Sequence, residues 1–160
     1  MKKEKIVMGK IHEKIYLGES LCKKTEHKLY YECLKDVFNC GETEDTEFTK
    51  MLKEVLSEEL SVDIKGYCSL DTHLDNYHGV DYFITLKTVT NTFIIITFDI
   101  SLYEKDEWKA DFLISPNTLN NFQVFVEKVV DAIQNVGQSD IFCPDKKVGR
   151  FFYQNQCGRK

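Results

Sequence analysis

The chain has 160 residues, a net charge of −5 at pH 7 and a hydrophobic fraction of 42%. This length and apolar content suffice for one domain with a buried core, and they exclude a disordered chain. The negative charge argues against tight nucleic-acid binding without sequence preference, which relies on many lysine and arginine contacts to phosphates. Residues 144–160 are nevertheless basic and aromatic, so this tail either follows a phosphate backbone or packs back onto the domain.

No stretch of the sequence approaches the roughly 18 consecutive apolar residues of a membrane helix. The charged N-terminus lacks the apolar region of a secretory signal. We therefore expect a cytoplasmic protein without a membrane partner. The six cysteines include no Cys-x-x-Cys pair, which argues against a zinc ribbon, and we expect reduced, mostly buried thiols.

Helical periodicity is clear in two segments of the first half of the chain. Apolar residues recur at helical spacing over residues 25–39, and a second helix is predicted over residues 46–60 with Thr46 as its N-cap. Residues 1–19 show no clear pattern. Residues 1–40 as a whole are expected to form either an added helical layer or a dimer surface, so a homodimer is one possible state.

After residue 60 the apolar period changes to two, which predicts β-strands. Four strands are predicted, over residues 62–67, 80–86, 93–100 and 110–114. The polar segment 71–79 is expected to be a loop, and a long amphipathic helix is expected from Ser115 to about Val136. Runs of strands between helices predict a single α+β domain, in which a mixed central sheet of about four strands is flanked by helices.

Two aspartates lie on the predicted central strands. Asp81 stands at the start of the second strand, and Asp99 stands near the end of the third. An antiparallel hairpin brings the start of one strand beside the end of the next, so we expect the two carboxylates to lie close together. Desolvated carboxylates need hydrogen bonds, a paired cation or a metal ion. Carboxylate oxygens suit Mg²⁺ or Mn²⁺, whereas the structural alternative is a turn cap or a pair with a lysine.

The order of these elements resembles the restriction-endonuclease-like core of the PD-(D/E)XK nuclease superfamily over residues 44–136. The resemblance rests on a helix, then Gly79-Val80-Asp81 on a strand, then Thr97-Phe98-Asp99-Ile100-Ser101 on the next strand, then a short strand and a helix. It implies a divalent-metal-dependent nuclease acting on DNA or RNA phosphodiesters. It also implies that Glu47, Asp81 and Asp99 bind Mg²⁺ or Mn²⁺.

The sequence departs from that family at Ser101, where the motif has a lysine that assists the attacking water. One of Lys105 or Lys109, just downstream, is predicted to assist catalysis in its place, and Lys87 and Lys128 are the other lysines that could substitute. The alternative is a catalytically inactive, nuclease-fold interaction protein that binds a protein or nucleic-acid partner. A phage or mobile-element accessory factor would fit that description.

Two weaker features adjoin this predicted edge. Asp71, His73, Asp75 and His78 form a cluster that either binds a transition metal or simply belongs to a polar loop next to the site. Trp108 either belongs to the core or offers a stacking contact, and we expect it in the core.

Overall fold

The structure is a computed structural model that describes residues 2–22, 28–88, 92–135 and 141–142. The elements in these ranges are α1 (Lys2–Leu17), α2 (Tyr30–Cys40), α3 (Glu47–Leu60), β1 (Ile64–Cys68), α4 (His73–His78), β2 (Tyr82–Lys87), β3 (Phe93–Ile100), β4 (Phe112–Ile114), α5 (Pro116–Asn120), α6 (Phe122–Gln134) and β5 (Ile141–Phe142). None of the described helices combines the length and apolar character needed to cross a membrane. The predicted basic tail, 144–160, lies outside the described residues.

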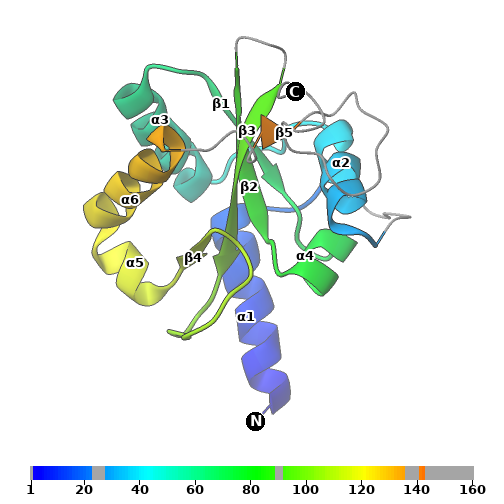
Figure 1. Cartoon of the computed structure of the whole chain (residues 1–160). Helices are drawn as coiled ribbons and strands as arrows, with labels where there is room; N and C mark the ends of the chain where they lie inside the picture. The colour runs from blue at the N-terminus through cyan, green and yellow to red at the C-terminus, as the bar shows by residue number, and fades with distance from the viewer. Residues whose placement is uncertain (1, 23–27, 89–91, 136–140, 143–160) are drawn as a thin grey trace.

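The sheet is mixed and has the order β1-β2-β3-β4. Strands β1, β2 and β3 pair antiparallel, whereas β4 runs parallel to β3. The short strand β5 pairs antiparallel with the other end of β3. Helices α3, α5 and α6 lie on one side of the sheet, and α2 and α4 lie on the other (Figure 1). The predicted α+β fold with a mixed sheet between helices is therefore confirmed.

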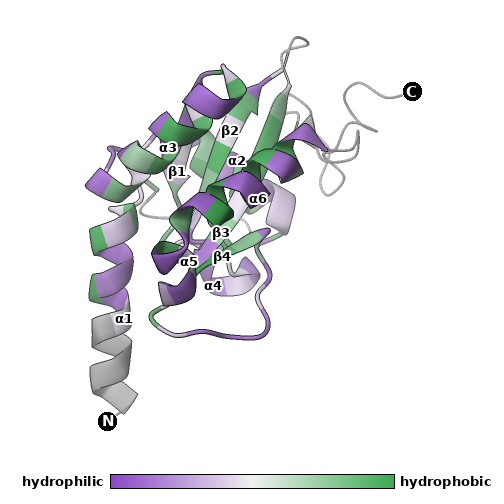
Figure 2. Cartoon of the chain, turned by 90° about the vertical axis from the view of Figure 1, so that its left-hand side faces the viewer, coloured by the Kyte–Doolittle hydropathy of each residue, from purple (hydrophilic) through white to green (hydrophobic). Residues whose placement is uncertain are grey.

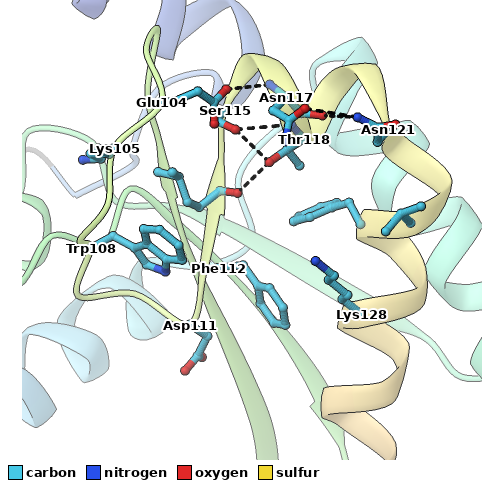
Figure 3. A pocket seen from close by; sticks show the side chains of 13 residues that line it. Glu104, Lys105, Trp108, Asp111, Phe112, Ser115, Asn117, Thr118, Asn121 and Lys128 are labelled. Carbon is cyan, nitrogen blue, oxygen red and sulfur yellow. Dashed lines mark hydrogen bonds between the residues drawn. The ribbon is translucent and has the colours of Figure 1, made fainter.

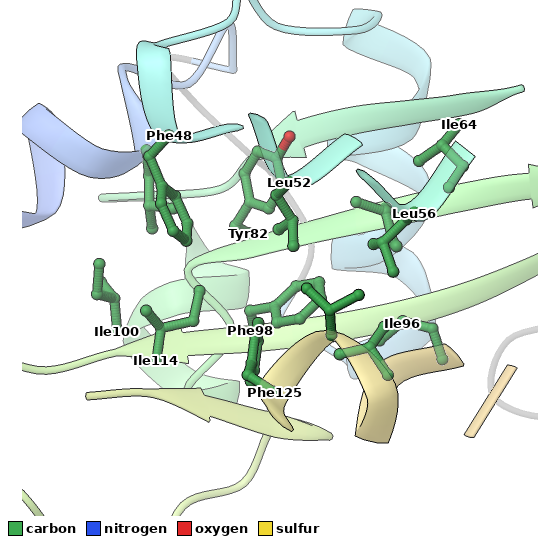
Figure 4. Packing of buried hydrophobic residues seen from close by; sticks show 14 of the residues in the cluster. Phe48, Leu52, Leu56, Ile64, Tyr82, Ile96, Phe98, Ile100, Ile114 and Phe125 are labelled. Carbon is green, nitrogen blue, oxygen red and sulfur yellow. The ribbon is translucent and has the colours of Figure 1, made fainter. Parts of the chain in front are cut away.

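Side chains alternate between two cores, one on each face of the sheet. On the α3/α6 face, Phe98 is fully buried and its ring lies 6.0 Å from that of Phe125 on α6 (Figure 4). On the α2/α4 face, Phe83 is equally buried and stacks on Tyr67 at 4.9 Å. Figure 2 shows that α3 and α6 carry hydrophilic residues on their outer sides. Burial on both faces explains the continuous apolar sequence of β3.

The structure differs from the sequence predictions in three segments. Residues 1–19, which show no clear pattern, contain helix α1. The expected loop 71–79 contains the short helix α4, which ends at Gly79 in the left-handed region with φ of 67°. The predicted long helix divides into α5 and α6 at Asn121, whose φ of −125° and ψ of 50° depart from helical geometry.

The cysteines are only partly as expected. Cys33 and Cys68 are free and buried, as predicted, but Cys22 and Cys40 form a disulfide, so the expectation of reduced thiols is wrong for this pair. The fold places the two residues together because α2 returns beside the segment that follows α1, which brings their Cα atoms to 6.0 Å. Cys143 and Cys157 lie outside the described residues.

Gly66 on β1 leaves space for the side chain of Tyr82 on β2. A Cβ atom at this position would overlap the hydroxyl of Tyr82 and lie 2.7 Å from its Cζ. We therefore expect Gly66→Ala to lower the free energy of unfolding, measured by urea denaturation, by about 1–3 kcal/mol. In a Tyr82→Phe background the nearest atom is absent, so the same substitution should cost less. An equal cost in both backgrounds would contradict this packing.

Candidate functional site

Asp81 and Asp99 lie at the end of the sheet where α4 joins β2. The β2–β3 register pairs Tyr82 with Phe98, and continuing it by one residue places the two aspartates side by side. They share the α2/α4 face because side chains alternate along each strand. Both are buried, with 2% of Asp81 and 8% of Asp99 exposed. Such desolvated carboxyls require specific partners.

Hydrogen bonds fix the position of Asp81. Its backbone N–H donates to the Phe98 carbonyl at 2.8 Å, and its Oδ2 accepts from the Ile100 N–H at 2.8 Å. The carboxyl thus takes the place of a backbone acceptor at the end of the β2–β3 ladder. The carboxyls of Asp75 and Asp99 also lie close enough to the Asp81 side chain to raise its pKa. One oxygen of Asp81 therefore accepts a hydrogen bond that stabilises the β2–β3 pair, and the side chain also faces Asp75 and Asp99.

Two further acids come from the helices. Asp75 lies on α4, and its Oδ2 also accepts from the Asp71 N–H at 2.8 Å. Glu13 lies half-buried on α1, where it interacts electrostatically with Asp75 and Asp99. We call Glu13, Asp75, Asp81 and Asp99 the acid cluster. No sequence signal pointed to Glu13, since it lies 68 positions before Asp81 in the chain.

Two members of the acid cluster, Asp81 and Glu13, have raised pKa values. Burial, followed by the proximity of Asp75 and Asp99, raises the pKa of Asp81 far above its ordinary value of 3.8. Burial, followed by the charges of Asp75, Asp71 and Asp99, raises the pKa of Glu13 to about 7. Like charges confined in a buried space disfavour full ionisation.

Lys105 supplies a positive charge to the acid cluster. Its Nζ lies 2.7 Å from Oδ2 of Asp99, and its side chain is 42% exposed. It belongs to the loop 101–111 between β3 and β4. Ser101 stands where the motif lysine was expected, and its Oγ accepts from the Tyr103 N–H at 3.1 Å. The Lys105 ammonium thus reaches Asp99 from a position four residues after Ser101.

The other predicted site residues lie apart from the carboxyl pair. Glu47 is exposed in the first turn of α3, and no hydrogen bond or ion pair joins it to the acid cluster among the described residues. Lys109 donates instead to the carbonyl of Tyr77 at 3.4 Å. The structure therefore brings together Asp81, Asp99 and Lys105, but not the remaining two.

The predicted histidine and aspartate cluster of segment 71–79 does not form one site. Nε2 of His78 lies 2.6 Å from the Lys28 carbonyl, and the ring of His73 tilts against that of Tyr77 at 5.2 Å. Asp75 faces Asp81 instead. The short helix α4 separates these side chains, so the polar segment contributes one carboxyl to the acid cluster.

The chemistry of the acid cluster fits a hard divalent cation, because its side chains offer carboxylate oxygens only. Within the described residues, however, no group of three or more His, Cys, Asp or Glu side chains has an arrangement that could hold a metal ion. Of the three predicted metal ligands, only Asp81 and Asp99 lie together, so these two would have to hold any divalent cation that bound here. A bound cation would polarise a phosphoryl oxygen and make water more acidic.

Comparison with known proteins adds no further constraint on this site. No protein-family model, curated protein or solved structure matches the chain.

Proposed function

We propose that the protein is a divalent-metal-dependent phosphodiesterase acting on nucleic acid, with its active centre at Asp81, Asp99 and Lys105. The observation that carries this proposal is the 2.7 Å ion pair between Lys105 and Asp99, beside the buried carboxyl of Asp81. Two acids and one ammonium are the groups that the PD-(D/E)XK resemblance requires. Lys105, on the loop 101–111, supplies the positive charge that Ser101 lacks.

Each of these residues has a defined part in the proposed reaction. Asp81 and Asp99 would hold the cation, and burial keeps their carboxyls in one geometry. The ammonium of Lys105 would orient the attacking water and offset the charge that develops on the phosphoryl oxygens. Its half-exposed side chain can reach a substrate at the surface as well as Asp99.

A second candidate is the inactive interaction protein of the same fold. The observation in its favour is that, among the described residues, no three-residue group is arranged for a metal ion. In this alternative, Lys105 simply neutralises Asp99, and the proton on Asp81 completes a structural network. The two candidates differ in whether Mg²⁺ or Mn²⁺ has any effect on the protein.

A cleavage assay separates the two candidates. Single- and double-stranded DNA and RNA are incubated with the purified protein in Mn²⁺, in Mg²⁺ and in EDTA. The proposed function predicts cleavage that requires a divalent cation. Binding of a nucleic acid without cleavage under every condition would instead support the interaction protein.

The two lysines of the loop 101–111 provide a matched comparison. We expect Lys105→Met to lower the rate of metal-dependent cleavage by about 10²–10³-fold, because an electrostatic contact to the reacting groups is lost. Lys109→Met should change that rate less than about 3-fold, since the Lys109 ammonium contacts the Tyr77 carbonyl. Equal effects of the two substitutions would contradict the role given to Lys105.

A further inference from the structure

A pocket of about 560 Å³ opens beside the edge strand β4, between the loop 101–111 and helices α5 and α6 (Figure 3). This volume falls in the range of sites that enclose small ligands. No member of the acid cluster lines the pocket, but the pocket lies next to that cluster. Lys105 lines the pocket and also pairs with Asp99, and Leu113, another lining residue, pairs with Asp99 in the β3–β4 register.

Aromatic rings form much of the pocket wall. Trp108 stands on the loop side and is 43% exposed, so the expectation that it belongs to the core is wrong. Phe112 on β4 lies across from Trp108 (Figure 3), and Phe125 on α6 also lines the pocket, with its ring edge to face with that of Phe112 at 5.9 Å. A tryptophan held at the rim of an aromatic pocket offers a flat surface to a planar ligand.

Polar groups are placed around these rings. Figure 3 shows the Lys128 ammonium directed from α6 toward the pocket, and no carboxylate of the described residues pairs with it. The Asn121 side-chain NH₂ donates to Asn117 at 3.1 Å, so the carbonyl oxygen of Asn121 remains an acceptor without a donor among the described residues. The pocket thus combines a stacking surface, an amide acceptor and, besides Lys105 that pairs with Asp99, a second cation without a carboxylate partner among the described residues.

The two carboxylates of the pocket are already engaged. Glu104 accepts from the Asn117 N–H at 2.7 Å. Asp111 accepts from the N–H and hydroxyl of Thr97 at 2.9 and 3.0 Å, which ties β4 to β3. These bonds direct the oxygens of both acids to N–H and hydroxyl donors of the protein, whereas Lys128 has no carboxylate partner among the described residues.

We propose that this pocket binds the base and sugar of one unpaired nucleotide, with Trp108 stacking on the base and Lys128 contacting the neighbouring phosphate. A base can enter such a pocket only when it is not paired in a duplex. The amide oxygen of Asn121 would accept from an exocyclic amino group of the base. The placement of the next phosphodiester at the acid cluster rests on the proposed function, whereas the binding itself does not.

Trp108 is the only tryptophan of the chain, so its fluorescence reports directly on the pocket. The wild-type protein is titrated in EDTA, which prevents cleavage, with a single-stranded oligonucleotide of mixed sequence and with the matching duplex. We expect saturable quenching by the single strand, and at least about 10-fold weaker binding of the duplex because its bases are stacked and paired.

Variants test which side chains carry the binding, measured by fluorescence anisotropy of a labelled single strand. Trp108→Ala should weaken binding by about 5- to 150-fold, whereas Trp108→Phe should retain most of it. Lys128→Gln should weaken binding and reduce the slope of log affinity against log salt by about 0.7. The matched control is Lys65→Gln, an exposed residue on the opposite edge strand β1, which should leave both quantities unchanged.

Absence of quenching up to about 1 mM oligonucleotide, or equal binding of the duplex, would overturn this inference. So would Trp108→Ala and Lys128→Gln variants that bind as the wild type does. Quenching without any metal-dependent cleavage would leave the pocket in place and remove the proposed function. Cleavage that persists unchanged in both pocket variants would preserve the proposed function and remove the pocket.

Discussion

Asp81→Asn is expected to reduce metal-dependent cleavage by about 100-fold or more while leaving the protein folded. The substitution removes a ligand charge that the proposed reaction requires. It retains an amide oxygen that can accept from the Ile100 N–H, the bond that Asp81 makes at 2.8 Å. Because the raised pKa of Asp81 keeps its carboxyl protonated in the absence of a cation, the neutral asparagine resembles the resting side chain closely.

The comparison requires both rates and folding to be measured. Cleavage rates in Mn²⁺ are taken for the wild type, for Asp81→Asn and for Glu47→Gln, with circular dichroism and urea denaturation of each. Glu47 is the control because it is an exposed acid outside the acid cluster. An Asp81→Asn protein that cleaves at the wild-type rate would exclude this residue from the reaction. A Glu47→Gln protein with the same large loss would restore Glu47 as a candidate ligand.

The wild type is expected to lose stability relative to Asp81→Asn as the pH rises. The folded pKa of Asp81 is raised above its ordinary value of 3.8, so the folded state binds the proton more tightly than the unfolded state does. This contribution to stability is complete below about pH 4 and declines toward the folded pKa, by at most about 1.4 kcal/mol for each pH unit. Asparagine has no proton to lose, so it lacks this decline.

Urea denaturation at pH 5, 6.5 and 8 measures the difference. The free energy of unfolding of Asp81→Asn minus that of the wild type should increase across this series, by up to about 4 kcal/mol. Glu13, whose pKa is raised from 4.5 to about 7, should cause a smaller loss of stability with rising pH in both proteins alike, and Glu13→Gln should remove that loss. A wild type that gains stability over Asp81→Asn with rising pH would contradict the protonated state of the cluster.

Strong local signals predicted most of the sheet. The apolar and β-branched residues 93–100 predicted β3 with the bounds that the structure has. Thr46 was correctly predicted to cap α3, since its Oγ1 accepts from the Thr49 N–H at 3.1 Å. Helix α1 was missed because apolar residues among its described side chains face solvent: Ile11 and Ile15 are 54% and 65% exposed. Tertiary packing decides such a helix more than periodicity does.

The candidate site could be predicted only where two neighbouring strands define it. The hairpin between β2 and β3 made the proximity of Asp81 and Asp99 predictable, because their positions along adjacent strands are fixed by register. Glu13 reaches the same place through the packing of α1, and Lys105 reaches it through the path of a loop. Neither the docking of a helix nor the path of a loop produces a periodic pattern in the sequence from which it could be predicted. The exposure of Trp108 depends on that same loop.

Binding of Mn²⁺ tests the metal-dependent centre most directly, because it does not require the substrate to be known. Free Mn²⁺ is followed by electron paramagnetic resonance during titration into the wild type, Asp81→Asn and Asp99→Asn at pH 6.5 and 8. We predict a saturable site in the wild type with higher affinity at pH 8, where protons leave the acid cluster more readily, and its loss in both variants. No binding by the wild type at about 1 mM Mn²⁺, or undiminished binding by both variants, would contradict the proposed centre.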